Sequence, residues 1–443
     1  MHRLSMHVFG EGERVPILHD ARGLPLFYPT LFTTSQLRNA GAAVNTIRNK
    51  LADILVLLRW EKARRRDLEA EFGQGAFLSV ADIASLRDFT MCDMRQAALP
   101  LADEKADRPV VLHLLEARVA SRPSSKVIGK QQHYNRLSTI ADYLEFVASV
   151  VTQHRNSAED PARIARMVQT LRKHRPRGLA SRFDEDAHDQ SPPSELIERF
   201  MRIGAEDHPQ NPFLSPPVRL RNAIIFGLFR STGIRRGELL SLRIDQFDLG
   251  HEPQVWIRRN QDDVSDSRRY QPVTKTRERL LPLPQSLADQ VQRYIMDVRS
   301  KVVPARRHPY LLVSHQKGST WGQPISLSAL NGQIFARMRA ADPAFEQIHP
   351  HAFRHHFNYE LSRSIDQRNA QARGSVDALP VAPISEAREM DVRAFLNGHR
   401  DKASGATYNR RHIRETSDRA ARQLQSGLIG NGKRNGDDNE SDQ

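Results

Sequence analysis

Two arginines, two histidines and a tyrosine occur in an order that suits chemistry on a phosphodiester. Arg235 ends the segment Ser-Thr-Gly-Ile-Arg, and His351 and Arg354 occur together more than a hundred residues later. His399 follows an Asn-Gly pair, and Tyr408 lies nine residues beyond it. Attack on a phosphodiester needs cations around the non-bridging oxygens, a nucleophile, and a proton donor for the departing oxygen. These residue types can do this chemistry without a metal ion.

Arginine fits the first of these tasks because its planar guanidinium binds two phosphate oxygens at once and keeps its charge. Arg235 and Arg354 are therefore the predicted phosphate clamp. Removing one preorganised donor of this kind costs roughly 2.7–4 kcal/mol of transition-state stabilisation. Glu238 lies one helical turn after Arg235, so we expect it to hold that guanidinium by an ion pair.

This ordered set resembles the tyrosine recombinases, also called phage-type integrases. The motifs of that family are matched, in chain order, by Thr232–Leu239, Lys275–Leu283, His351–Arg354, Gly398–His399 and Tyr408. Each motif is short and weak by itself, but the order and spacing of the set are specific. The resemblance covers about residues 195–425.

The resemblance implies both a fold and a mechanism. The fold is mainly α: a helical N-terminal DNA-binding region, then a mixed α/β, mostly helical, catalytic domain with a small antiparallel sheet. Tyr408 is expected to attack the scissile phosphate and form a 3′-phosphotyrosine, while Lys275, on a β-hairpin, protonates the departing 5′-oxygen. His351 and His399 complete the implied catalytic set. The 5′-hydroxyl of another strand then reseals the DNA, and no ATP, metal or other cofactor is implied.

The implied partner is double-stranded DNA, bound by four protomers on two duplexes, with other recombinase subunits or helper proteins possible in such assemblies. The stretch 410–428 either exchanges between protomers or covers its own. Integration, excision, transposition and chromosome-dimer resolution all fit the same residues. Two other functions also fit: a DNA-relaxing enzyme of the type IB topoisomerase kind, and an inactive DNA-binding regulator on the same fold.

The composition agrees with a polyanionic partner. The 443 residues include 66 Lys and Arg against 52 Asp and Glu, a formal charge of +14, and such a surplus favours nucleic acid. The single cysteine, Cys92, cannot form an intrachain disulfide or a thiolate zinc cluster, and it suits a reducing compartment. No apolar run approaches the roughly 20 residues that span a bilayer. We therefore expect a cytoplasmic, nucleoid-associated bacterial protein.

Hydrophobic periodicity predicts the elements that must position these residues. Helices are predicted over 35–72, from Ser79 as N-cap over 80–91, and over 126–151; a small hairpin is predicted over 15–28. After residue 193, helices are predicted at about 287–298, 328–340, 352–362 and 386–396. Strands are predicted at 255–258, 270–273 and 279–283.

Composition divides the chain into five regions. Residues 1–120 form an N-terminal region of hairpin and helices without an assigned role, and residues 121–173 form a helical core segment, which the resemblance implies binds DNA. Pro, Gly and charged residues mark a linker at 174–193. Residues 194–428 are the predicted catalytic domain, and the Gly- and Asn-rich residues 429–443 a disordered tail.

Several cationic residues have competing interpretations. Lys126, Lys130 and Arg136 cluster at the start of the helix predicted over 126–151, where they either bind phosphates or form a solvated charged face. His351 and His355 have the i, i+4 spacing of metal ligands. Arg354 would repel a cation there, and no acidic residue stands where a zinc protease needs one, so a metal site is disfavoured.

The chain also departs from the family pattern in two places. Arg354 and His399 are separated by 44 residues, more than the family usually has, and residues 371–383 look like an inserted loop. Asn397 stands where a leucine is usual. Neither departure removes a catalytic atom, but the insertion leaves the placement of the helix before His399 to the tertiary structure.

Overall fold

A computed structural model describes five stretches of the chain and three further single residues: 2–93, 127–155, 157–178, 192–374 and 383–399, with 417, 421 and 422. Lys126, Tyr408 and the predicted tail at 429–443 lie outside these residues, as does most of the predicted linker. The chain forms two compact units, Met1–Phe9 with Glu13–Ser181 and Gly10–Gly12 with Arg182–Gln443. None of the described helices is both long and apolar enough to cross a membrane.

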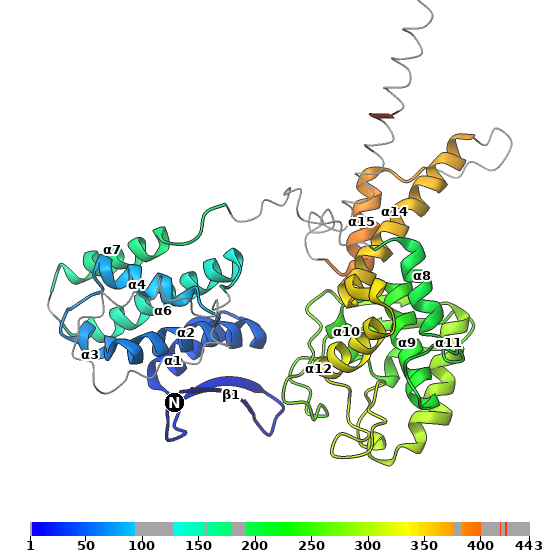
Figure 1. Cartoon of the computed structure of the whole chain (residues 1–443), viewed down its shortest axis with the longest axis horizontal. Coiled ribbons are helices and arrows are strands. Elements are labelled where there is room, and N and C mark those ends of the chain that lie inside the picture. The colour runs from blue at the N-terminus through cyan, green and yellow to red at the C-terminus, as the bar shows by residue number, and fades with distance from the viewer. Residues whose placement is uncertain are drawn as a thin grey trace, which may run out of the picture. The chain divides into compact units, whose positions relative to one another are not determined.

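The first unit is a helical bundle with one hairpin (Figure 1). Its elements are β1 (Arg3–Val8), β2 (Arg14–His19), α1 (Phe27–Phe32), a π-helical turn η1 (Thr33–Arg38), α2 (Val44–Arg64), α3 (Leu68–Gly73), α4 (Val80–Thr90), α6 (Lys130–Thr152) and α7 (Asp160–Lys173). The helices predicted after Ser79 and over 126–151 are confirmed. Ser79 caps α4 by accepting a hydrogen bond from the Asp82 amide, and Asp82 returns one to Ser79.

One hydrophobic core joins the elements on both sides of residues 94–126. Leu137, Ile140 and Leu144 of α6 are at most 1% exposed and belong to the same buried cluster as Ile54 and Trp60 of α2. The apolar stripe predicted for α6 therefore faces α2, as a period of 3.6 residues requires.

The predicted hairpin over 15–28 is wrong in one of its strands. β2 pairs antiparallel with the preceding strand β1, with Leu4 opposite Leu18, whereas the stretch after residue 19 contributes a single bridge, His19 to Pro25. The chain then enters helix α1 at Phe27, so the second strand is not formed. The helix predicted over 35–72 is likewise divided, because Gly41 (φ 73°) and Arg65 (φ 52°) turn the chain before and after α2.

The second unit is mostly helical with a small sheet. Its α-helices are α8 (Ser194–Ile203), α9 (Pro216–Thr232), α10 (Arg236–Ser241), α11 (Gln285–Arg293), α12 (Leu327–Ala329), α13 (Ala336–Ala341), α14 (Pro350–Gly374) and α15 (Glu386–Asn397). Short 3-10 or π-helical pieces are η2 (Ile244–Gln246), η3 (Tyr294–Val298), η4 (Arg299–Lys301), η5 (Val303–Arg307), η6 (Leu330–Phe335) and η7 (Pro343–Gln347). The four helices predicted after residue 193 are confirmed, the third of them as the first half of the longer α14.

The sheet of this unit has three antiparallel strands in the order β3 (Phe247–Asp248), β4 (Gln254–Ile257) and β5 (Arg279–Pro282). The strands predicted near 255 and 279 are confirmed, so the predicted fold class is found: mainly α, with a small antiparallel sheet. The strand predicted over 270–273 is absent. In this segment the Asn260 side chain donates to the Pro272 carbonyl (3.2 Å) and accepts from the Thr274 amide (3.3 Å). These side-chain hydrogen bonds take the place of the backbone hydrogen bonds that a paired strand would make.

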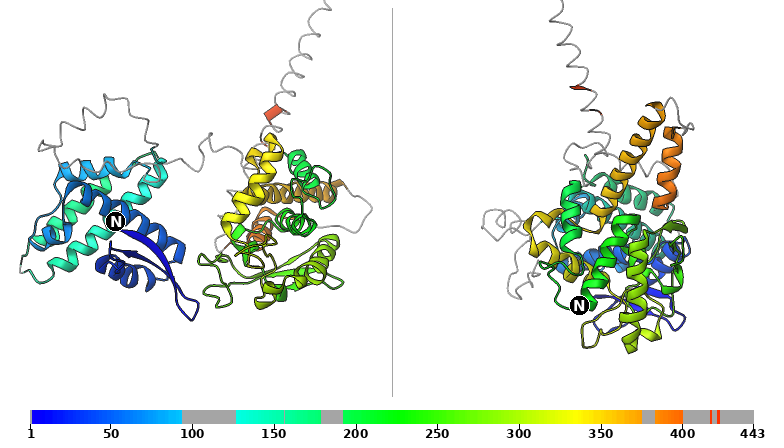
Figure 2. Two further views of the ribbon diagram at one scale, coloured as in Figure 1. Left: turned by 60° about the horizontal axis from the view of Figure 1, so that its bottom comes forward. Right: turned by 90° about the vertical axis from the view of Figure 1, so that its right-hand side faces the viewer.

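A buried group of aromatic rings fixes α14 against α9. Phe353 stacks on Phe229 of α9 with ring centroids 6.0 Å apart, and it meets Phe335 and Phe200 edge-on. All four rings are fully buried. Because Phe353 immediately precedes Arg354, this packing places Arg354 at the C-terminal end of α9. Helices α14 and α15 lie side by side on the same unit (Figure 1 and Figure 2).

Candidate active site

Arg235 lies at a sharp break between two helices. Helix α9 ends at Thr232, and Gly233 adopts the left-handed conformation (φ 59°) that suits glycine at a helix C-terminus. A Cβ on Gly233 would also lie 2.5 Å from the ring of Phe357. Arg235 is then the residue before α10, with extended backbone, and its amide donates to Glu238 Oε2 (2.8 Å). The Thr-Gly-x-Arg pattern is therefore a helix break that directs an arginine side chain out of the core.

Arg354 is held from several directions in the interior. Only 1% of the residue is exposed. Its Nη1 donates to the Gly233 carbonyl (2.8 Å), and its Nη2 donates to the Asn397 carbonyl (2.9 Å) and to His399 Nε2 (3.1 Å). These bonds tie α14 to the end of α9 and to the end of α15.

The two predicted clamp residues meet at one backbone oxygen. Arg235 Nη1 donates to the Asn397 carbonyl (3.2 Å), which also accepts from Arg354, although Arg235 and Asn397 are 162 residues apart in the sequence. That carbonyl is available because α15 ends there: Gly398 is left-handed (φ 63°), and the His399 amide donates to Ala394. The last carbonyls of a helix carry partial negative charge and attract cations. The structure thus brings together Arg235 and Arg354 as the sequence predicted.

His399 completes this cluster as a neutral imidazole. Its Nε2 receives a hydrogen bond from the guanidinium of Arg354, which can only donate, so the ring proton lies on Nδ1. Burial and the charge of Arg354, followed by Arg235 and Arg279, lower the pKa of His399 to about 4. A helix terminus, two guanidinium groups and a neutral histidine therefore lie within one hydrogen-bonded cluster.

His351 lies three residues before Arg354 in the first turn of α14. Desolvation and the charge of Arg354, with further contributions from His349 and the two arginines at 235 and 236, lower the pKa of His351 to about 4. Its ring meets that of His355 edge-on, with centroids 4.6 Å apart. At neutral pH His351 is uncharged, as a proton acceptor must be.

The predicted ion pair between Glu238 and Arg235 is present, but Arg279 is the closer partner of Glu238. Its carboxylate lies 3.9 Å from Arg235 Nη1, but its main partner is Arg279 of β5, at 3.0 Å, with both side chains 1% exposed. Thr276 also donates to this carboxylate. Burial raises the pKa of Glu238, but Arg279 and these hydrogen bonds outweigh it, so the pKa lies below the usual range. Glu238 fixes the backbone of Arg235 and the strand, rather than mainly the Arg235 guanidinium.

Lys275 is exposed between two anchored threonines. Thr274 Oγ1 lies 3.1 Å from Ser241 Oγ of α10, and Thr276 donates to Glu238 at the start of the same helix. Lys275 is in neither strand of the predicted hairpin. It lies in the connection between the antiparallel strands β4 and β5, in an anchored segment that leads into β5. These contacts hold the Lys275 segment against α10, the helix that begins beside Arg235.

Arg279 is the residue of this region whose role the sequence did not reveal. Its Nε donates to the Leu396 carbonyl at the end of α15 (2.8 Å), while its Nη2 pairs with Glu238. A Cβ on Gly398 would lie 2.6 Å from Arg279 Nη1, so the turn after α15 packs directly on this guanidinium. The signal in the sequence is its position within the Lys275–Leu283 motif.

The residues predicted to contact DNA differ in whether their side chains are exposed. Lys130 is exposed at the start of α6. Arg136, by contrast, is 6% exposed, and its Nη1 donates to the Thr90 carbonyl (2.6 Å) and the Cys92 carbonyl (3.3 Å). Arg136 therefore holds α6 against the end of α4 and is not available to a phosphate.

The histidines of α14 are not arranged as a metal site within the described residues, which contain no group of three or more His, Cys, Asp or Glu side chains suited to one. His355 and His356 are buried, at 5% and 0% exposure.

Helix α14 continues to the insertion, and Asn369 joins the two ends of that insertion. The Asn369 side chain donates to the Ile384 carbonyl (3.0 Å) and accepts from the Ile384 amide (2.7 Å).

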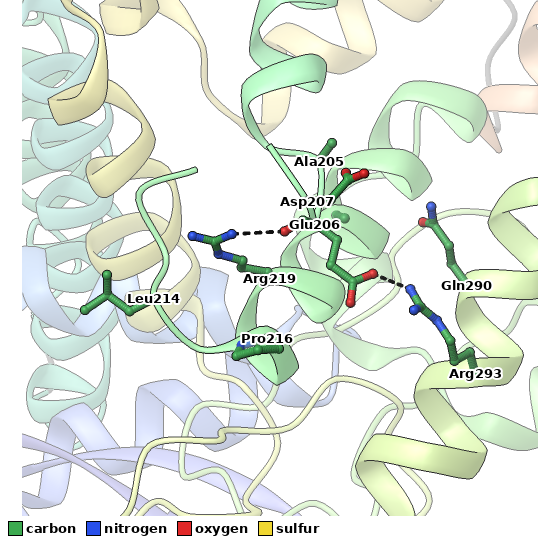
Figure 3. A pocket seen from close by; sticks show the side chains of 9 residues that line it. Ala205, Glu206, Asp207, Leu214, Pro216, Arg219, Gln290 and Arg293 are labelled. Carbon is green, nitrogen blue, oxygen red and sulfur yellow. Dashed lines mark hydrogen bonds and ion pairs between the residues drawn. The ribbon is translucent and has the colours of Figure 1, made fainter. Parts of the chain in front are cut away.

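A surface hollow of about 710 Å³ lies elsewhere on this unit, at the start of α9 and along α11 (Figure 3). Arg219 donates to the Glu206 carbonyl (3.3 Å), and Arg293 pairs with the Glu206 carboxylate. None of the predicted catalytic residues lines it. Two of its charged groups, Arg293 and Glu206, pair with each other, and its lining residues are separate from the cluster at Asn397.

Comparison with known proteins points to one family. The phage integrase family is matched over residues 205–374. The tyrosine recombinase XerD of Lacticaseibacillus casei is 25% identical over 228 residues, which cover 48% of this chain and 68% of that protein. Among solved structures, XerH site-specific recombinase bound to palindromic difH substrate, a post-cleavage complex, aligns with 14% identity and a TM-score of 0.42, covering 89% of this chain and 93% of that one. XerA recombinase aligns with 14% identity and a TM-score of 0.34, covering 89% and 97%.

Proposed function

We propose, from the premise that the chain belongs to the tyrosine recombinase family, that it cuts and rejoins DNA strands at specific sites through a 3′-phosphotyrosine intermediate. The observation that carries this proposal is the convergence of Arg235 and Arg354 on the Asn397 carbonyl, with His399 bonded to Arg354. Two guanidinium groups from distant parts of the chain are thereby preorganised at one point, as stabilisation of a phosphorane-like transition state requires.

In the cleavage step the phenolic oxygen of Tyr408 forms a bond to phosphorus, and the bond from phosphorus to the 5′-oxygen breaks. Arg235 and Arg354 bind the non-bridging oxygens as negative charge develops there. Lys275 gives its proton to the departing 5′-oxygen, and the neutral imidazole of His351 takes the proton of the phenol. His399 accepts from Arg354 through Nε2 and so holds that guanidinium in place beside the phosphate.

Rejoining is the same reaction in reverse, with the 5′-hydroxyl of another strand as nucleophile. One phosphoester replaces another, so the energy of the broken bond is kept in the protein–DNA linkage and no ATP is needed. The guanidinium groups supply the charge stabilisation for which many phosphoryl-transfer enzymes use metal ions. The proposed mechanism therefore uses neither a nucleotide cofactor nor a metal ion.

The proposed substrate is double-stranded DNA, bound by four protomers on two duplexes. The net charge of +14 supports a polyanionic partner. The first unit would grip the duplex through exposed cations such as Lys130, and the second unit would supply the chemistry. Other recombinase subunits or helper proteins would join this assembly at some sites.

The test is a covalent trap. Duplexes selected from a random pool by binding to the protein are nicked near the cleavage point, so that a short 5′-hydroxyl fragment diffuses away after attack. We expect the wild-type chain to give a protein–DNA adduct that survives denaturing electrophoresis, and Tyr408→Phe to bind the same duplex but give no adduct. An adduct formed by Tyr408→Phe would refute the assignment of the nucleophile. Relaxation of supercoiled plasmid irrespective of sequence would indicate a DNA-relaxing enzyme instead.

A further inference from the structure

A buried pair of asparagine side chains joins α14 to α15 directly behind the arginine cluster. Asn397 Nδ2 donates to Asn358 Oδ1 (2.7 Å), and Asn358 Nδ2 donates to Asn397 Oδ1 (3.1 Å), so each amide both gives and receives. Asn358 is 0% exposed and Asn397 is 1% exposed. A buried amide is costly unless its hydrogen bonds are made, and here both amides satisfy each other.

Arg393 fixes the orientation of both amides. Its Nη1 donates to Asn358 Oδ1 (3.3 Å), which identifies that atom as the oxygen because a guanidinium can only donate. Its carbonyl accepts from Asn397 Nδ2 (2.9 Å), which identifies that atom as the nitrogen. Arg393 is itself held by Ser362 Oγ (2.8 Å) and by the Glu389 carboxylate. The pair therefore has one allowed arrangement.

The same two asparagines are bonded to the arginine cluster through the backbone. Asn358 Nδ2 also donates to the carbonyl of Arg354, one turn earlier in α14 (2.8 Å). Asn397 supplies the carbonyl on which Arg354 and Arg235 converge, at 2.9 and 3.2 Å. Any movement of the amide pair is therefore transmitted to the backbone of one clamp arginine and to the shared acceptor of both.

We infer that Asn358 and Asn397 are a positioning pair, which sets the Asn397 carbonyl and with it the two clamp guanidiniums in the geometry used for cleavage. This inference rests on the proposed function. An apolar pair at the same place would fill the space but would not fix direction, because dispersion contacts tolerate sliding and rotation. A reciprocal amide pair specifies both, which is what a site needs when an error of a few tenths of an ångström matters.

The test separates positioning from stability. Asn358→Leu combined with Asn397→Leu removes both amides together, so neither is left unpaired and the loss of stability is small. Arg393 keeps three of its partners: the backbone carbonyl of residue 358, to which its Nη1 donates (3.2 Å), Ser362 and Glu389. The matched control is Asn222→Leu, which removes another fully buried amide, paired with Arg221 on α9. Melting temperature, affinity for the selected duplex and the single-turnover rate constant of adduct formation are measured for each.

We expect the double variant to bind the duplex like the wild type but to form the adduct about 10- to 100-fold more slowly, since a misplacement of about 1 Å can cost about 100-fold. Asn222→Leu should lower the melting temperature and leave the rate constant of the folded protein unchanged. Should the double variant not fold, Asn358→Asp replaces it. Asn358→Asp keeps the acceptor for Arg393 but opposes two oxygens in the pair, so the same slowing is expected.

Two results would overturn the inference: an unchanged rate constant in the folded pair variant, or an equal slowing in Asn222→Leu. A readout without DNA separates its failure from that of the proposed function. Burial, the largest cause of the low His399 pKa of about 4, remains in the pair variant, but Arg354 and Arg235 no longer hold their places beside the ring. NMR titration should therefore show the His399 pKa rising by the part of the shift that these two charges contribute. If the wild-type chain forms no adduct, the proposed function fails. The His399 titration then tests the positioning pair by itself. A higher pKa in the pair variant supports the positioning pair, and an unchanged pKa refutes it.

Discussion

Replacing Arg279 by methionine should destabilise the second unit and disconnect its catalytic segments. The Arg279–Glu238 pair is closed at 3.0 Å with both side chains 1% exposed, and Arg279 also donates to the Leu396 carbonyl. Removing one partner leaves a buried carboxylate with too few donors, which costs about 3–5 kcal/mol in comparable pairs. For a unit of this size, about 2–4 °C of melting temperature corresponds to 1 kcal/mol. Calorimetry should therefore show the transition of this unit about 6–20 °C lower.

The pH dependence identifies the cause. In the wild type the pKa of Glu238 lies below its usual range, so its contribution to stability is present above the unfolded-state pKa and is lost as the pH falls through the lower folded-state value. In Arg279→Met, burial acts unopposed by the arginine and raises the pKa of Glu238. The unfolded state is the same for both proteins, so the stability difference between them should shrink as the pH falls through the raised folded-state pKa of the variant and should continue to shrink down to the lowered folded-state pKa of the wild type.

The control is Glu238→Gln combined with Arg279→Met, which removes both charges and should recover much of the melting temperature at neutral pH. It should not recover adduct formation, because Arg279 no longer holds the end of α15 to the strand. A neutral-pH melting temperature for Arg279→Met within about 2 °C of the wild type, or a difference that does not change with pH, would refute this account of the buried pair.

Three further outcomes follow from the same geometry. Arg354→Ala should lower the rate constant of adduct formation by about 100- to 1,000-fold but change duplex affinity far less, since it is one contact among many; equal losses in a filter-binding assay would contradict its role at the reacting phosphate. Because the folded-state pKa values of His351 and His399 are both about 4, the unfolded chain takes up their protons first, and the free energy of unfolding should fall as the pH decreases from about 6.5; flat stability in urea titrations over that range would count against these lowered pKa values. The logarithm of the association constant for the duplex should fall linearly with the logarithm of the salt concentration, with a slope of about −0.9 for each neutralised phosphate. A salt-independent Kd would exclude an extended electrostatic contact.

The sequence by itself predicted the parts of this protein that depend on short-range pattern. A period of 3.6 residues located α6 and α15, and the apolar stripe of α6 is buried as predicted. The Ser79 cap was readable because its partner is three residues away. The order of Arg235, His351, Arg354 and His399 predicted a phosphate-binding set because such motifs name residue types at fixed spacing.

Tertiary structure alone decided which atoms these residues contact. Arg136 resembled a surface cation but points inward to the Thr90 carbonyl, and Glu238 pairs with Arg279 more closely than with its own neighbour Arg235. Both outcomes depend on backbone carbonyls and carboxylates that approach only after helices and strands have packed. Composition and spacing carry no information about those directions.

The same holds for the Asn397 carbonyl, the point on which the cluster depends. The sequence marked Asn397 only as a departure from a familiar pattern, since every residue has a carbonyl and none is distinguished by its side chain. The oxygen becomes an acceptor for two arginines because Gly398 ends α15 there and because Phe353 packs α14 against α9. Helix propensity and hydrophobic period are local properties, whereas a hydrogen bond across 162 residues forms only where the packed core leaves two groups within reach and correctly directed.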